Sequence, residues 1–200
     1  MRKIISSIVA AFCAFNLAAA ASSDQKEIDE LYRRGLTGDK AAVEQCIARL
    51  EGALETQPGN QLARVYLGSA YTLRSRDLGF GPKKLQVLRQ GVGVMNEAVA
   101  AAPADPKVRL ARALTISAFP AILGYRADAQ KDFAELTVMA ERSPEKFAEG
   151  DLQIVYFEAG NAAKSRDDKA RAEELWRKAA EHPADAAVDA KVKTVLNGGR

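Results

Sequence analysis

Residues 67–71 read Leu67-Gly68-Ser69-Ala70-Tyr71, in which a large apolar residue precedes a glycine and a tyrosine follows. On a helix, the bare backbone at Gly68 would let a second helix approach closely. The ring of Tyr71 would then pack against the neighbouring helical pair, as stacked repeats require. The stretch therefore predicts the first helix of a helical hairpin, meaning two antiparallel helices joined by a short turn.

Three segments of the chain end in the same way, with small apolar residues followed by proline. Apolar residues at helical spacing precede each proline. Because proline lacks an N–H and clashes with the preceding turn, a helix does not continue through it. We therefore predict that second helices of hairpins end within residues 53–58, 98–103 and 179–183.

The glycine pattern of residues 67–71 returns near the C-terminus. There Gly160 is followed, three positions later, by the small residue Ala163. Asp167-Asp168 predicts the turn, and Trp176 is the bulky residue of the helix that follows. A fixed pattern that recurs along a chain is typical of a repeat architecture.

On these residues the chain resembles the tetratricopeptide repeat family. The resemblance implies an all-α fold, a superhelical array of about four antiparallel helix hairpins with a C-terminal capping helix. The third hairpin is degenerate, and its register near Arg112 is left open. The predicted repeat domain spans 22–196, with hairpins at 29–58, 61–103, 106–143 and 151–183, a capping helix at 184–196 and a tail at 197–200.

The second hairpin is longer than the family pattern and holds a helix-breaking stretch at 77–82, with Gly79, Gly81 and Pro82. Such an insertion lengthens both helices or adds a loop. One interpretation is a mobile basic loop that engages a partner. The other is an extended turn between helices, with Phe80 tucked beneath it as an anchor. Five basic residues surround the break: Arg74, Arg76, Lys83, Lys84 and Arg89.

Residues 1–21 have the composition of a secretory signal peptide. A positive start is followed by an apolar stretch and by small residues, with predicted cleavage after Ala20 or Ala21. The alternative is an uncleaved N-terminal anchor in the inner membrane. The first interpretation places the mature chain in the periplasm. Cys13 would leave with the signal, and Cys46 is predicted to be a buried structural thiol.

The chain lacks the motifs of common catalytic, metal and cofactor sites. His182 is the one histidine of the sequence, which excludes H-E-x-x-H zinc motifs. Residues 79–84 do not have the spacing of a phosphate-binding loop, and Gly91-Val92-Gly93 is interpreted as a chance match. We therefore predict that the protein is not an enzyme and that it needs no cofactor and no metal.

Charge is unevenly distributed along the chain. Residues 61–126 contain ten basic and three acidic residues, a net charge of +7, whereas 22–60 (five basic, eight acidic) and 127–200 (twelve basic, fifteen acidic) each have −3. In an exported protein this basic middle does not indicate nucleic acid. It favours an acidic peptide, anionic headgroups or an ordinary solvated face.

The resemblance implies that the first helices of the hairpins line a groove that binds a protein or a peptide. We predict a non-catalytic periplasmic interaction module, an adaptor or an assembly factor, that is a monomer or a weak homo-oligomer. The alternatives are a self-assembling structural repeat and, third, an enzyme. The predicted groove residues are Tyr66, Ser69, Thr72, Arg109, Phe157, Asn161 and Lys164.

Overall fold

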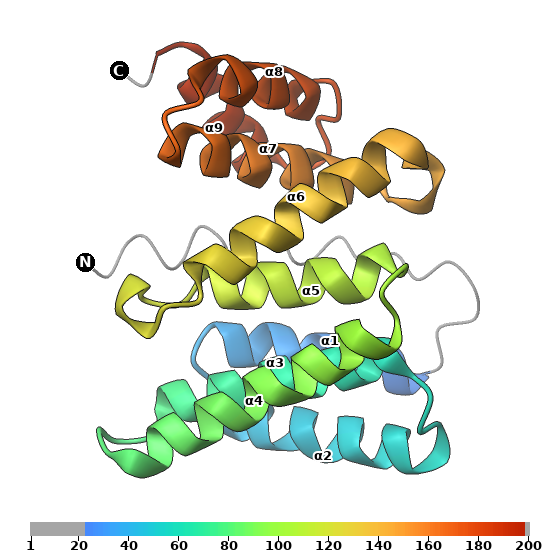
Figure 1. Ribbon diagram of the computed structural model, residues 1–200. Helices are drawn as coiled ribbons and strands as arrows, with labels where there is room; N and C mark the ends of the chain where they lie inside the picture. Colours follow the sequence, from blue (N-terminus) through green and yellow to red (C-terminus); the bar gives the residue numbers. More distant parts are fainter. Residues whose placement is uncertain (1–22, 199–200) are drawn as a thin grey trace. The chain divides into compact units, whose positions relative to one another are not determined.

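The computed structural model describes residues 23–198 and is helical in this range, without strands (Figure 1). The predicted signal peptide and the last two residues of the tail lie outside the described residues. Two short 3-10 helices, at 121–123 and 144–146, accompany the α-helices. The α-helices are α1 (Ser23–Leu36), α2 (Lys40–Thr56), α3 (Gln61–Asp77), α4 (Pro82–Ala101), α5 (Pro106–Ser117), α6 (Arg126–Arg142), α7 (Glu149–Ser165), α8 (Lys169–Ala180) and α9 (Ala186–Leu196).

The described chain packs as two compact units divided between Thr115 and Ile116. We call residues 23–115 the N-terminal unit and residues 116–198 the C-terminal unit. The division falls near the end of α5, inside the third predicted hairpin. The all-α class is confirmed for the described residues, whereas a single continuous array from 22 to 196 stays a prediction.

The helices begin and end near the prolines and the capping residues that the sequence places at their ends. α2, α4 and α8 end two or three residues before Pro58, Pro103 and Pro183. Aspartate or asparagine side chains cap several helices at the N-terminus. The Asp39 carboxylate, for example, accepts a hydrogen bond from the N–H of Ala42 at 3.0 Å.

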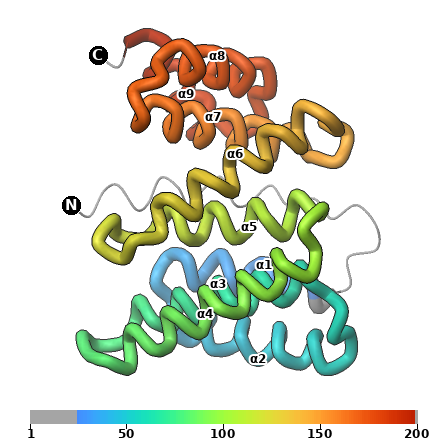
Figure 2. The backbone as a smooth tube through the Cα atoms, viewed as in Figure 1, coloured from blue at the N-terminus to red at the C-terminus, as the bar shows by residue number. Residues whose placement is uncertain are grey.

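Helices α3 and α4 form the longest hairpin, and Figure 2 shows them running antiparallel. Gly68 on α3 faces Gly91 on α4, so closely that a β-carbon at Gly68 would lie 2.6 Å from the carbonyl oxygen of Gly91. The predicted role of Gly68 in a close helix approach is confirmed. Gly91, which belongs to the stretch interpreted as a chance match to a phosphate-binding motif, is the partner of Gly68 in this contact, a packing role that the sequence analysis did not predict.

Two other contacts join neighbouring helices. A β-carbon at Gly160 on α7 would lie 2.5 Å from the indole of Trp176 on α8, so Gly160 lies in a close contact between these two helices. The Tyr71 hydroxyl on α3 donates to Glu51 on α2 at 2.7 Å, which joins the second hairpin to the first.

The 77–82 insertion lengthens the helices instead of forming a large loop. α3 continues to Asp77 and α4 begins at Pro82, which leaves only residues 78–81 as a turn. The predicted burial of Phe80 beneath this turn is wrong, because its side chain is 106 % exposed. A four-residue turn between helix ends is too short to fold back over its own aromatic ring.

The cores are built from apolar helix faces, as an amphipathic pattern predicts. In the N-terminal unit the buried set includes Cys46, which confirms its predicted burial. In the C-terminal unit, α9 packs on α7 and α8 and buries Val188 and Val192. The amide oxygen of the buried Gln153 accepts hydrogen bonds from the backbone N–H groups of Ala184 and Asp185, which fixes the start of α9.

Candidate functional site: the first-helix faces

A line of hydroxyl groups joins the helices α1, α3 and α5 in the N-terminal unit. The Tyr32 hydroxyl on α1 lies 2.6 Å from Ser69 Oγ on α3. Ser69 Oγ in turn lies 2.8 Å from Thr115 Oγ1 on α5. α1, α3 and α5 therefore meet along one side of this unit.

The donors and acceptors along this line follow from the hydrogen bond that Thr115 makes. Thr115 Oγ1 donates its proton to the carbonyl oxygen of Ala111 at 2.8 Å. Ser69 must then donate to Thr115, and Tyr32 must donate to Ser69, because each hydroxyl has one proton. Burial raises the pKa of Tyr32 to about 12, so the phenol keeps its proton at neutral pH and acts as a donor.

Tyr66 lies beside this line and is half-buried. Its ring packs edge-to-face against the ring of Tyr32, with centroids 5.3 Å apart and planes at 78°. Such a pair is favourable and fixes the orientation of both rings. Of the four predicted groove residues in this unit, Tyr66 alone keeps a partly open side chain.

The other three predicted residues of the unit are buried, which corrects their assignment to an open groove. Ser69 is the centre of the hydroxyl line. Thr72 donates to the carbonyl oxygen of Ser69 at 2.8 Å and packs opposite Gly91. Arg109 donates to the carbonyl oxygen of Pro103 at 3.2 Å. Their positions along the helices predicted that these side chains would face the groove. In the structure they pack against neighbouring helices instead.

In the C-terminal unit the predicted residues on α7 differ in exposure. Phe157 is buried, which again corrects its assignment to an open groove, whereas Asn161 is half-buried and Lys164 is exposed. The ammonium of Lys164 lies 5.6 Å from the centre of the Trp176 ring, within the range of a cation–π contact. The predicted set is therefore divided between the two units.

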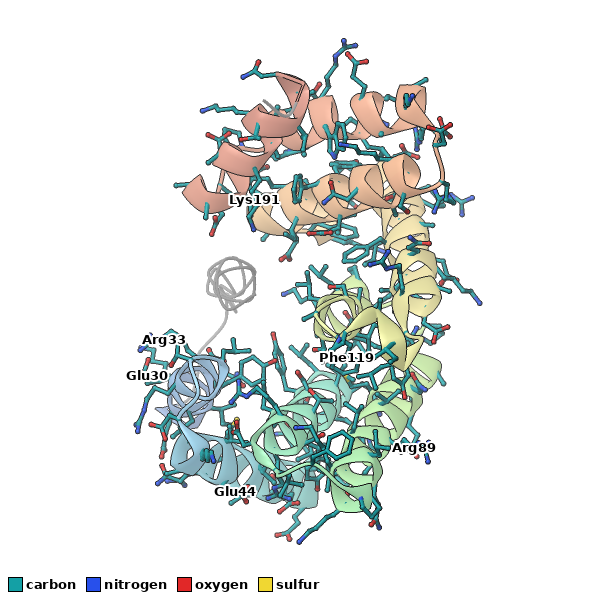
Figure 3. All side chains as sticks on the ribbon, turned by 90° about the vertical axis from the view of Figure 1, so that its left-hand side faces the viewer. Glu30, Arg33, Glu44, Arg89, Phe119 and Lys191 are labelled. Carbon is teal, nitrogen blue, oxygen red and sulfur yellow. The ribbon has the colours of Figure 1, made fainter. Side chains whose placement is uncertain are left out.

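Glu158 is a feature of α7 that the sequence analysis missed. Burial raises its pKa above the ordinary 4.5, while a hydrogen bond from Asn161 Nδ2 at 3.3 Å and the charge of Lys191 on α9 (labelled in Figure 3) act against this rise. The available signal was a single acidic residue within the apolar stretch 152–163.

Most of the basic residues around the α3–α4 turn are engaged within the N-terminal unit. Arg74 pairs with Glu44 on α2 and lies over the Tyr71 ring. Arg76 pairs with Asp77, and Lys84 donates to two carbonyl oxygens of the α3 end. Three of the five are exposed, Arg76, Lys83 and Arg89, and Figure 3 shows Arg89 on the outer side of α4.

Groups that could do other chemistry have structural surroundings. Burial raises the pKa of the Cys46 thiol to about 12, which leaves almost no reactive thiolate at neutral pH. His182 lies 2.7 Å from Glu149 and stacks on the Tyr156 ring. Within residues 23–198, no group of three His, Cys, Asp or Glu side chains is placed to hold a metal ion.

Comparisons with protein-family models and with curated proteins found no match to this chain. None of the helices in the described range combines the length and the apolar character needed to cross a bilayer.

Proposed function

We propose that this chain is a non-catalytic protein–protein interaction module of the tetratricopeptide type, which binds a protein or a peptide on its first-helix faces. The role is that of an adaptor or an assembly factor. It requires no cofactor and does not involve nucleic acid. The composition of residues 1–21 supports a periplasmic location.

The hydrogen-bonded line Tyr32–Ser69–Thr115 is the observation that carries this proposal. It ties α1, α3 and α5 along one side of the N-terminal unit, while α2 and α4 complete the hairpins. Successive first helices that share one side make a surface long enough to bind an extended or helical peptide.

Tyr66 is the residue of this face best suited to anchor a partner. Tyrosine contributes a large contact area at a low entropic cost and is enriched among residues that dominate binding energy. The edge-to-face contact with Tyr32 holds the ring before a partner arrives, which lowers the cost of ordering it. Its partial exposure leaves area that a partner can bury.

The proposal can be tested by selecting peptides from a displayed random library on the purified full chain. Their affinities are then measured by fluorescence anisotropy for the parent and for Tyr66→Ala. Loss of an anchor tyrosine is expected to weaken binding about tenfold or more. Hydrophobic burial and edge-to-face packing both contribute to that loss.

Tyr125→Ala is the matched control. Tyr125 is also half-buried and packs edge-to-face, against Phe119, with centroids 5.5 Å apart and planes at 77°, but it lies in the connection between α5 and α6. Its loss is expected to leave the affinity within about twofold. Failure to select any peptide, or equal losses with Tyr66→Ala and Tyr125→Ala, would refute the proposed function.

A further inference from the structure

The α3–α4 turn displays an aromatic side chain that the fold does not use. Phe80 is 106 % exposed, and Gly79 and Gly81 on either side have no atom within 4 Å of an added β-carbon. Figure 1 shows this turn at the free end of the long α3–α4 hairpin. A large apolar residue that stands free of its own chain indicates a surface for interaction.

Hydrogen bonds within the hairpin hold the turn that carries Phe80. The ammonium of Lys84 donates to the carbonyl oxygens of Arg76 and Leu78, at 2.9 and 3.1 Å. Ser75 Oγ donates to the carbonyl oxygen of Lys84 at 2.9 Å. These three hydrogen bonds tie the end of α3 to the start of α4, so the turn between them is held open with the ring outward.

Basic residues follow this turn on the first part of α4. Lys83 and Arg89 are exposed, Lys84 brings a third cation, and Leu85 adds apolar surface with 44 % exposure. No acidic residue occurs between Asp77 and Glu97 in the sequence, and Asp77 itself pairs with Arg76. The end of the hairpin therefore combines one projecting aromatic residue with a stretch of α4 that carries basic residues and no acidic residue before Glu97.

The shape of this surface favours a lipid bilayer over a protein. Phe80 projects from a turn, so a protein partner would have to supply a complete pocket around it. A bilayer surface deforms around an apolar side chain and accepts it at the boundary of headgroups and acyl chains. Anionic headgroups attract nearby lysine and arginine side chains, by about 1 kcal/mol each.

We infer that the α3–α4 turn docks on the surface of a membrane that contains anionic lipids, with Phe80 inserted and Lys83 and Arg89 at the headgroups. This contact is peripheral and does not depend on the proposed peptide-binding face. It would hold the N-terminal unit at a bilayer while its first-helix face remains free for a partner.

The test uses the full chain with Phe80→Trp, because a tryptophan reports its own surroundings and is insensitive to attachment elsewhere in the chain. The chain's own tryptophan, Trp176, is buried in the C-terminal unit and contributes a constant signal. Vesicles of phosphatidylcholine with or without phosphatidylglycerol are titrated in. We expect a blue shift of the emission and quenching by brominated acyl chains only with the anionic vesicles.

Ile122→Trp is the matched control for the aromatic residue. Ile122 is 93 % exposed in the α5–α6 connection, but its charged neighbours in sequence, Arg126 and Asp128, cancel. Lys83→Glu with Arg89→Glu, added to Phe80→Trp, is expected to weaken partitioning at least about tenfold. Lys26→Glu with Lys146→Glu changes the net charge equally and is expected to have little effect.

Three results would overturn the inference. The first is no quenching of the Phe80→Trp variant by anionic vesicles. The second is equal quenching of the Phe80→Trp and Ile122→Trp variants, which would indicate general adsorption. The third is a blue shift with a soluble polyglutamate peptide and none with vesicles, which would make the turn a site for acidic proteins.

Discussion

Gly68 and Gly91 approach each other so closely that a β-carbon on either one would meet the carbonyl oxygen of the other, at 2.6 Å and 2.5 Å. The contact sets the distance between α3 and α4. Because the obstacle in both directions is backbone, no side-chain rotation can relieve it.

Gly68→Ala is expected to destabilise the fold by about 1–3 kcal/mol, the usual cost of overpacking. Gly93→Ala, two residues from Gly91 on the same helix, has no atom within 4 Å of the added β-carbon and is expected to stabilise the helix by up to about 1 kcal/mol. Urea unfolding followed by circular dichroism measures both. Equal effects of the two substitutions would mean that the helices are not in contact at Gly68.

Ser69→Ala is expected to cost about 1–3 kcal/mol, because it removes the acceptor of the Tyr32 hydroxyl and the donor to Thr115. Ser165→Ala is the control, since Ser165 also donates one hydrogen bond and accepts one but is exposed. It should change stability by less than about 0.5 kcal/mol. In a double-mutant cycle, Tyr32→Phe and Ser69→Ala should be non-additive. Additive losses would show that the two hydroxyls do not interact.

Glu158→Gln should raise stability at pH 7 and have little effect near pH 4. The folded-state pKa of Glu158 lies above its unfolded value, so the folded state is favoured while the group is protonated. Stability is then lost as the pH rises through the window between the two pKa values. Thermal unfolding of parent and variant across this range measures the difference, and a parallel pH profile for the two proteins would contradict the assignment.

Glu141→Gln provides a comparison of the opposite sign. A hydrogen bond from Lys178 and its charge, together with Arg171, lower the pKa of Glu141. The ionised Glu141 therefore stabilises the folded state above the pKa that this group has in the unfolded chain. This stabilisation is lost as the pH falls through its lower pKa in the folded state. The variant should be less stable than the parent at pH 7 and equal to it in strong acid. Because this side chain is partly exposed, the loss should shrink in high salt.

Cys46 should resist thiol reagents while the protein is folded. Burial raises its pKa to about 12, and the charge of Asp29 adds to the rise. In a Cys13→Ser background at pH 8, modification by an aromatic disulfide should be about 100-fold slower or more in the native protein than in urea. Rapid native labelling would show that α1 and α2 do not cover the thiol.

The sequence predicted the helices well because their ends carry strong local signals. Prolines after α2, α4 and α8 stop those helices whatever they pack against, and Asp39 and Asp168 cap the helices that follow. Gly68 and Gly160 were found because each sits in a recognisable pattern. These features depend on residues that are neighbours along the chain.

The features that the sequence did not reveal depend on residues of neighbouring helices, which are distant along the chain. Gly91 has no informative neighbours in sequence, and its role appears only when Gly68 is placed against it. Ser69 was assigned to an open groove because one helix alone does not reveal that Tyr32 and Thr115 cover it. One of the two interpretations of the 77–82 stretch placed Phe80 beneath the turn, but the turn has no other segment of chain over it to bury the ring.

The most direct measurement of the central claim is a map of backbone amide chemical shifts, recorded on the full chain with and without a selected peptide. The account predicts that the largest changes fall on α1, α3 and α5 around Tyr32, Tyr66 and Thr115, and that Tyr66→Ala abolishes them. Changes centred on α2 and α4, with those first helices unaffected, would contradict it.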